Sequence, residues 1–295
     1  MKSKIICFGE VLWDLLPTGK LAGGAPMNVA YHANALGLKA DIISRIGTDT
    51  LGAELLDFLV KKGISTTLIQ HDTTHKTGVV NVTLDAQGSP TYEIVMPTAW
   101  DFIENTEGVV NAVSIADMLV YGSLVCRNDV SKNTLFELLK IAKTKVFDVN
   151  LRMPFYDKSL IESLLSQADI VKMNEVELVT ISGWFNDETE FERQIQKLYE
   201  QFNLDTLIVS HGSEGAYCFE KGQLYFQPSF KITVQDTIGS GDAFLAAFLT
   251  EKMEGKDPQK CLITACKAGA YVATQAGATP LINQKILRGM SYLSN

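Results

Sequence analysis

The chain has 295 residues, of which 46% are hydrophobic and 20% are charged, and its formal net charge is −8. This composition is ordinary for a globular chain that buries a large core, and the length allows one large α/β domain or two small ones. The acidic balance, with no run of Lys or Arg longer than two residues, argues against a nucleic-acid or anionic-membrane surface.

Short β-type runs alternate with helical segments along most of the chain. The first strand is predicted at Lys4–Phe8, and after a long loop a helix at Ala25–Leu36 ends at Gly37. Further strands are predicted at Ala40–Ser44, Met118–Tyr121, Lys145–Val149, Ile170–Met173 and Leu207–Ser210. Further helices are predicted at Thr50–Lys62, Val130–Ala142, Ser159–Gln167, Glu175–Ile181 and Glu188–Phe202. This alternation indicates parallel βαβ units, so we expect an α/β fold with a central sheet covered on both faces.

One segment interrupts the alternation. Gly78–Leu84 and Thr91–Met96 are strand-like runs joined by the turn sequence Asp85–Pro90, which indicates a hairpin. A hairpin does not join a parallel sheet easily, so we expect it to project from the sheet edge, together with Val11–Leu21. We interpret residues 11–22 and 76–100 as a small lid on a single domain that spans residues 1–295. The alternative is a surface excursion without function.

The cysteines and the amino terminus indicate where the protein works. Five cysteines occur without any C-x-x-C pair, so we expect reduced, buried thiols at Cys7, Cys126, Cys218, Cys261 and Cys266. The amino terminus lacks the apolar length of a secretory signal, and no 18-residue apolar stretch follows. We therefore expect a cytoplasmic protein with no membrane partner.

Residues Asp236–Leu249 carry the most informative motif. Gly239 and Gly241 let the backbone turn its N–H groups toward one point, and the following apolar run predicts a helix that starts at Ser240 or Gly241. Such a turn forms an anion pocket at a helix N-terminus. Asp242 at its mouth suggests phosphoryl transfer, in which the carboxylate takes a hydroxyl proton. The alternative makes Ser240 an N-cap and Asp242 a first-turn acid.

Polar residues near the amino terminus suggest a sugar site. The segment Gly23–Ala30 opens the first helix, and its glycines permit close backbone approach. Asn28 in the first turn suits a polyhydroxylated ligand, although local capping is equally open. Asp14 is an acid in an apolar run, and sugar hydroxyl groups would supply the hydrogen-bond partners that it needs.

A third cluster suggests a metal site beside phosphates. Asn174 and Glu177 follow a predicted strand, and their oxygen atoms can hold hydrated Mg²⁺, although an N-capping Asn with first-turn acids explains them equally well. The common phosphate loops, G-x-x-x-x-G-K-[ST] and G-x-G-x-x-G, are absent, as is the protein-kinase motif set. The 4 histidines show no local spacing that suits a metal.

Together the three clusters resemble the hallmark regions of the ribokinase (pfkB-type) family of carbohydrate kinases, over essentially the full chain. The resemblance implies a doubly wound α/β fold with a mostly parallel sheet, a β-lid, ATP as phosphoryl donor, Mg²⁺, and in many members K⁺. The residues that match the catalytic base and the anion hole are Asp242, Gly239, Ser240 and Gly241. The residues that match sugar-binding positions are Asp14, Gly24 and Asn28.

The same resemblance assigns the nucleotide and metal positions. Ser210–Gly215 resembles the strand and turn that approach the nucleotide, so we assign Ser210, Gly212, Gly215 and Lys172 to nucleotide binding. Asn174 and Glu177 match the family's magnesium motif, partly through water, and Asp236 is assigned to a monovalent cation. The second motif departs from the commoner Asp-Thr-Thr-Gly-Ala-Gly-Asp at Ile238 and Ser240. Neither change removes a backbone donor, but Ile238 leaves the geometry of the cation site less defined.

The sequence favours one class of substrate and leaves several alternatives open. Phe8–Pro17 and Phe147–Arg152 look most like the fructokinases within the family. From Thr77 to Met118 there is no Lys or Arg, so the lid offers no partner for a substrate carboxylate or phosphate. Arg45, Arg152 or Lys20 could reach the site from elsewhere in the chain. We expect a kinase of a neutral monosaccharide, most like a fructokinase; a ribokinase, a nucleoside kinase and a non-catalytic sugar sensor are the alternatives. Apolar strand residues in the lid also suggest a homodimer formed through it.

Overall fold

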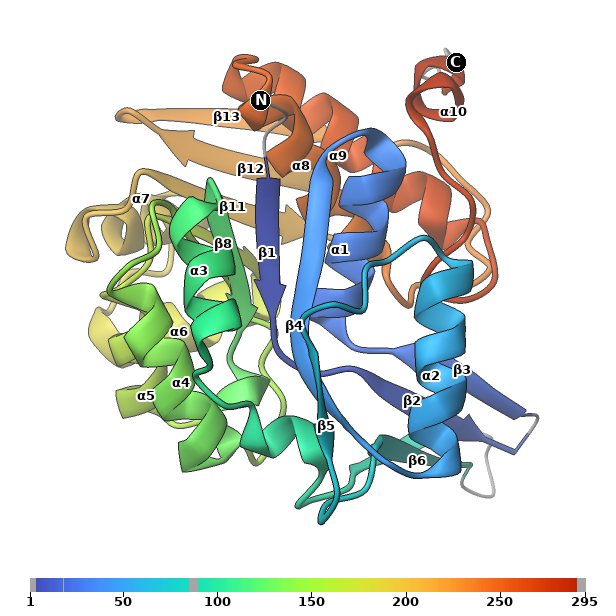
Figure 1. Ribbon diagram of the computed structural model, residues 1–295. Coiled ribbons are helices and arrows are strands. Elements are labelled where there is room, and N and C mark those ends of the chain that lie inside the picture. Colours follow the sequence, from blue (N-terminus) through green and yellow to red (C-terminus); the bar gives the residue numbers. More distant parts are fainter. Residues whose placement is uncertain (1–3, 18, 85–89, 291–295) are drawn as a thin grey trace.

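The computed structural model describes residues 4–17, 19–84 and 90–290. Within these residues a nine-stranded sheet forms the centre of the molecule, in the order β13-β12-β11-β10-β9-β8-β1-β4-β5 (Figure 1). Its strands are β1 (Lys4–Phe8), β4 (Lys39–Gly47), β5 (Ile69–Asp72), β8 (Met118–Gly122), β9 (Lys145–Asp148), β10 (Ile170–Asn174), β11 (Thr206–His211), β12 (Gly215–Glu220) and β13 (Gln223–Pro228). All pairs from β5 to β11 are parallel, which confirms the predicted mostly parallel sheet.

Helices cover both faces of this sheet. One face carries α1 (Ala25–Leu36), α2 (Thr50–Lys61), α8 (Ser240–Met253) and α9 (Pro258–Ala273), and the short α10 (Gln284–Gly289) packs beside α9. The other face carries α3 (Glu107–Ile115), α4 (Asp129–Leu139), α5 (Lys158–Leu165), α6 (Glu175–Phe185) and α7 (Phe191–Gln201). Alternate residues of β1 enter the two cores, since Ile5 and Cys7 join the first while Ile6 and Phe8 join the second. The doubly wound arrangement is therefore confirmed.

Some elements were not predicted. β12 and β13 form an antiparallel hairpin that extends the sheet beyond β11, with Lys221 and Gly222 at positive φ in its turn. A hairpin can thus extend this sheet at its edge, because its first strand pairs with only one strand of the sheet and this pair can be antiparallel. The helices α3 and α9 and the edge strand β5 were also missed, whereas β1 and α1 have the predicted bounds.

A second, smaller sheet lies below the large one. Its order is β3-β2-β6-β7, formed by β2 (Leu12–Leu16), β3 (Gly19–Gly23), β6 (Gly78–Leu84) and β7 (Pro90–Ile94). The antiparallel pair β6–β7 confirms the predicted hairpin, and the turn residues 85–89 lie outside the described residues. β2 pairs in parallel with β6, so the segment after β1 joins the hairpin.

Two further expectations concern the whole chain. All five cysteines are free and buried, as predicted. Among the described helices, none has the length and the apolar content that crossing a membrane requires.

Candidate active site

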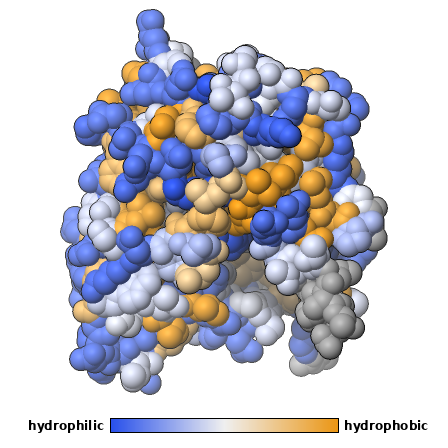
Figure 2. Space-filling view, turned by 90° about the horizontal axis from the view of Figure 1, so that it is seen from below, coloured by the Kyte–Doolittle hydropathy of each residue, from blue (hydrophilic) through white to orange (hydrophobic). Residues whose placement is uncertain are grey.

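A cavity of about 1210 Å³ opens at the carboxyl ends of the central strands, between the large sheet and the small one. Figure 2 looks at the molecule from below and shows this face hollowed, with hydrophobic residues gathered beside the hollow. Crevices at this edge are the usual ligand sites of open α/β sheets. Of the predicted site residues, those that line the cavity are Asp14, Gly24, Asn28, Lys172, Asn174, Ser210, Gly212, Gly215, Gly239, Ser240, Gly241 and Asp242. Asp236 and Glu177 are not among the lining residues.

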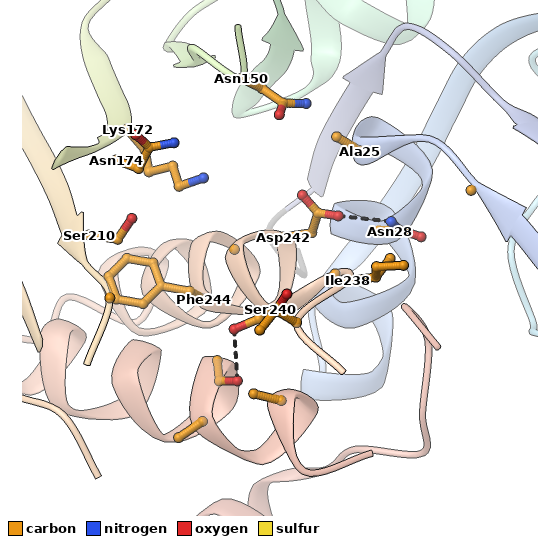
Figure 3. Close-up of a pocket in the computed structure, with 18 of the residues that line it drawn as sticks. Ala25, Asn28, Asn150, Lys172, Asn174, Ser210, Ile238, Ser240, Asp242 and Phe244 are labelled. Atoms are coloured by element: carbon orange, nitrogen blue, oxygen red, sulfur yellow. Dashed lines mark hydrogen bonds between the residues drawn. The ribbon is translucent and has the colours of Figure 1, made fainter. Parts of the chain in front are cut away.

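Asp242 lies in the first turn of α8 and is half-buried. Its Oδ2 accepts a hydrogen bond from Asn28 Nδ2 at 2.8 Å (Figure 3). Burial raises the pKa of Asp242 to about 6, the negative charge of Asp148 adds to this, and Lys172 and the Asn28 hydrogen bond oppose it. Asp242 is thus mainly ionised at neutral pH and able to accept a proton.

The turn before α8 leaves the amino end of the helix open. The helix begins at Ser240, as predicted, and no side chain caps it. Its N-cap residue Gly239 has φ 76°, and a Cβ there would lie 2.6 Å from the carbonyl oxygen of Ala278, so only glycine fits without a shift. The side chain of Ser240 points to α9, because its Oγ donates to the carbonyl oxygen of Gly269 at 2.9 Å. The N–H of Ser240 donates to the carbonyl oxygen of Thr237 at 3.2 Å. The remaining first-turn amides are available to an anion.

A buried ion pair lies beside this turn. Lys172 Nζ is 3.0 Å from Asp148 Oδ1, and it also lies 3.2 Å from the position of a Cβ on Gly241. Burial alone would lower the pKa of Lys172, but the negative charges of Asp148, Glu177 and Asp242 raise it. Lys172 therefore adds a permanent positive charge to the anion site. Sequence reasoning missed Asp148, although an acid at the end of a predicted apolar strand was a usable signal.

The acceptor side of the cavity carries further polar groups. Asp14 on β2 has a pKa raised to about 6 by burial, and its Oδ2 lies 2.7 Å from the position of a Cβ on Gly23. Asn28 Oδ1 is buried and has no hydrogen-bond partner among the described residues. These groups have hydrogen-bonding capacity that a hydroxylated ligand would satisfy.

Glu10 is a cavity residue that sequence reasoning did not assign. It lies two residues after the end of β1 and is 3% exposed, and burial raises its pKa to about 7. Its Oε1 accepts from the N–H of Ala25 at 3.2 Å, so it caps the first turn of α1, while its Oε2 has no partner in the described structure. A lone acid after an apolar strand was the signal available. The close contact of Gly24 with the Glu10 backbone explains why a glycine opens this helix.

Asn174 and Glu177 form a complete capping box at the start of α6. Asn174 Oδ1 accepts from the N–H of Glu177 at 2.9 Å, and Glu177 Oε2 accepts from the N–H of Asn174 at 2.8 Å. Glu177 Oε1 accepts from the N–H of Leu151 at 2.8 Å. Each carboxylate oxygen keeps a lone pair, so this pair fits hydrated Mg²⁺ held through water. Across the described residues, no three His, Cys, Asp or Glu side chains group as a metal site.

The remaining predicted site residues are those assigned to nucleotide binding and Asp236, which was assigned to a monovalent cation. Ser210 is the penultimate residue of β11, just before the turn that contains Gly212 and Gly215, both at positive φ. Asp236 closes a loop instead: its Oδ1 accepts from the N–H of Ile238 and its Oδ2 from the N–H of Gly277, each at 3.0 Å. Asp236 therefore shapes the backbone that leads into α8.

Comparison with known proteins identifies the relatives of the chain. The model of the pfkB family carbohydrate kinase matches residues 3–285. Fructokinase from Escherichia coli is 29% identical over 94% of this chain and 95% of its own length. The structure of fructokinase from Xylella fastidiosa with bound ATP is 25% identical, covers 98% of both chains and has a TM-score of 0.86. A double mutant of Vibrio cholerae fructokinase, in a form with fructose, ADP and potassium ion bound, covers 99% of this chain and 98% of its own at 24% identity and a TM-score of 0.84, which shows the shared fold.

Proposed function

The chain belongs to the pfkB family of carbohydrate kinases, and on that premise we propose that it transfers the γ-phosphate of ATP to a hydroxyl group of a neutral monosaccharide, with fructose as the first candidate. One observation carries the proposal: Asp242, hydrogen-bonded to Asn28 at 2.8 Å, stands at the uncapped amino end of α8. A proton acceptor and an anion-binding helix end thus share one wall of the cavity, as phosphoryl transfer to a hydroxyl requires.

In the proposed reaction, Asp242, the backbone amides before α8 and Lys172 each have one role. The hydroxyl oxygen of the sugar attacks the γ-phosphorus in line, and the bond from this phosphorus to its bridging oxygen breaks, so the electron pair leaves with ADP. Asp242 accepts the hydroxyl proton. The backbone amides of Gly239 and Gly241 and the ammonium group of Lys172 stabilise the negative charge on the transferring group. Because the pKa of Asp242 is about 6, the base is ready at neutral pH.

Metal and nucleotide contacts complete the assignment. Asn174 and Glu177 would hold Mg²⁺ partly through water, and the bound ion would neutralise phosphate oxygens. Asp236 is proposed to shape a K⁺ site through the loop that it closes. The nucleotide would lie along Ser210, Gly212 and Gly215, supported by the ATP-bound fructokinase of similar fold.

The acceptor wall favours an uncharged sugar. Asp14 and Asn28 offer the hydrogen-bonding groups, and Gly24 gives the sugar close access to the backbone. The small sheet contributes an apolar surface to the same wall, made of Leu12, Val80, Tyr92 and Ile94. In the described structure this part of the wall includes no Lys or Arg, so nothing there would attract a phosphate or carboxylate group of a substrate. Fructose is supported by the fructokinase relatives.

We propose that the small sheet, within residues 11–22 and 76–100, acts as a lid that excludes water during transfer. We also propose that two copies pair through it, since Tyr92 is 57% exposed on its apolar face. The five unpaired cysteines support a cytoplasmic setting.

A panel of acceptors tests the proposal. ATP consumption is measured with fructose, ribose, adenosine and a sugar acid, with Asp242→Ala as the inactive control. Turnover with fructose that exceeds the others supports the assignment, whereas preference for ribose or adenosine moves it to a ribokinase or nucleoside kinase of the same fold. Tight sugar binding with no ATP consumption by the wild-type chain would overturn catalysis and indicate a sugar sensor.

A further inference from the structure

The loop after β9 carries Arg152 into the cavity. Asn150 and Arg152 both line the cavity, and Asn150 projects into the same space as Asp242 and Lys172 (Figure 3). Arg152 is exposed, and its one hydrogen bond in the described structure runs from NH1 to the adjacent Leu151 carbonyl oxygen at 3.0 Å. Its guanidinium group therefore remains available to a ligand.

This loop is fixed in an unusual backbone conformation. Asn150 has φ 41°, in the left-handed region that non-glycine residues rarely adopt. Buried groups hold the chain on either side of it: Ser123 Oγ donates to the Val149 carbonyl oxygen at 2.7 Å, and Glu177 Oε1 accepts from the N–H of Leu151 at 2.8 Å. Ser123 and Glu177 are 1% and 5% exposed, so these bonds are shielded from water. Because hydrogen bonds from two different parts of the fold hold the backbone of this loop, the loop gives Arg152 a defined position.

Carboxyl groups surround Arg152 in the acceptor region. Glu10, Asp14 and Asp242 place three carboxyl groups around the acceptor region, and the positive charge of Arg152 lowers the pKa of each against the effect of burial. The arginines 45 and 127 are committed to ion pairs elsewhere. Among the arginines of the described chain, Arg152 alone lines the cavity.

Phosphoryl transfer adds negative charge to a pocket that already holds several carboxyl groups. A neutral sugar enters this acidic pocket, but the product leaves with a phosphate group that carries nearly two negative charges at neutral pH. Lys172 is already paired with Asp148 on the donor side. A planar, permanently charged guanidinium is suited to two phosphate oxygens at once.

We propose that Arg152 binds the phosphoryl group as it passes from ATP to the sugar and holds it in the product, and that Glu177 is a positioning residue which fixes the loop that carries Arg152. The proposal rests on the proposed function. In the step itself, the sugar oxygen forms its bond to the γ-phosphorus, the bond to the bridging oxygen of ADP breaks, and the proton moves to Asp242. Arg152 exchanges no proton and only balances charge.

The first test compares Arg152→Ala with Arg193→Gln, an exposed arginine on α7 away from the cavity. We expect kcat to fall about 10²–10³-fold in Arg152→Ala, with KM for the neutral sugar within about threefold of wild type. Added guanidinium ion should restore part of the lost kcat. Calorimetry with the purified sugar phosphate from the wild-type reaction should show weaker binding by about tenfold or more. Arg193→Gln should match wild type in all three measurements.

The outcomes separate the two proposals. If the wild-type chain phosphorylates no sugar, the proposed function fails and the product cannot be prepared. If it does, but Arg152→Ala keeps kcat and product affinity within about threefold of wild type, the role of Arg152 is overturned. A kcat loss without weaker product binding and without guanidinium rescue overturns it as well.

Glu177→Gln tests the positioning role. Asn174 and Leu151 donate to different oxygens of Glu177, and glutamine replaces one of these oxygens by an NH₂ group, so one of the two N–H groups loses its acceptor. We expect a kcat loss and a weaker affinity for the sugar phosphate, neither of which adds fully to the losses in Arg152→Ala, because both changes act on the same contact. The Mg²⁺ concentration for half-maximal activity is measured in parallel, because Glu177 is also proposed to hold Mg²⁺ through water. Product affinity at the wild-type level in Glu177→Gln, whatever its Mg²⁺ requirement, would overturn the positioning role.

Discussion

The starts of α6 and α8 both have an acid three residues after the N-cap, but side chains cap the start of α6 and leave the start of α8 open. Each helix has an acid at its third position, Glu177 in α6 and Asp242 in α8. In α6 the N-cap is Asn174, and the two side chains satisfy each other's backbone N–H groups in a capping box. In α8 the N-cap is Gly239, which has no side chain to offer, so the helix end stays open.

The difference shows what decides whether a helix start becomes a binding site. A capping side chain occupies the first-turn donors and ties down the acid three residues later, which gives local stability. A glycine leaves the donors for a ligand and frees Asp242 to accept from Asn28, which belongs to another helix. Packing then has to supply the stability that the cap does not, and Ala243, Leu245 and Phe248 of α8 are fully buried.

The largest expected effect is on the acid of the open helix. Asp242→Ala removes the proposed base, so kcat should fall by about 10²–10⁴-fold, the scale typical of general-base catalysis. The thermal midpoint serves as the control for folding, and it should change little because the side chain is half-buried beside the cavity. Turnover near the wild-type level would remove Asp242 from the mechanism and erase the functional difference between the two helix starts.

A methyl group on the N-cap of α8 should be the next most severe change. In Gly239→Ala the residue keeps φ 76° only under strain, and its Cβ would meet the Ala278 carbonyl oxygen at 2.6 Å. The first-turn amides would shift, and we expect a loss of about 10²-fold in kcat, as for a misplaced oxyanion donor. Gly183→Ala in α6, where a Cβ meets nothing within 4 Å, is a matched control. Equal kinetics in the two variants would contradict the open-end interpretation.

The hydrogen bond from Asn28 should set the pH range of the open helix. It lowers the pKa of Asp242, which burial and Asp148 raise to about 6. A base works only when ionised, so activity should fall as pH drops through this pKa. Asn28→Ala should therefore move the acid limb of kcat/KM to higher pH and reduce kcat at pH 8 by about tenfold. The profile is measured from pH 5 to 9. An unmoved acid limb would mean that another group titrates.

The same two helix starts show how far the sequence could be read. The glycines and Asp242 were predictable, because the backbone freedom of glycine and the apolar run after it are local signals. The hydrogen bonds from Asn28 to Asp242 and from Leu151 to Glu177 join residues 214 and 26 positions apart, and no local pattern encodes them. A local signal marked Glu10 and Asp148 as acids near the ends of apolar strands, but their contacts and the position of Arg152 became visible only when the fold brought the ends of β1 and β9 together.

The smallest expected effect belongs to the closed helix, and it tests whether capping is its main task. Asn174→Ala leaves the N–H of Glu177 without its acceptor, so the free energy of unfolding should fall by about 0.5–2 kcal/mol in urea titration. Asn174→Asp keeps an acceptor oxygen and should restore most of this loss. Because the proposed metal contact runs through water, the Mg²⁺ requirement of Asn174→Ala should rise by no more than about threefold. Unchanged stability together with a much larger rise would show that the two helix starts differ less than their hydrogen bonds indicate, since α6 would then also be open to a ligand.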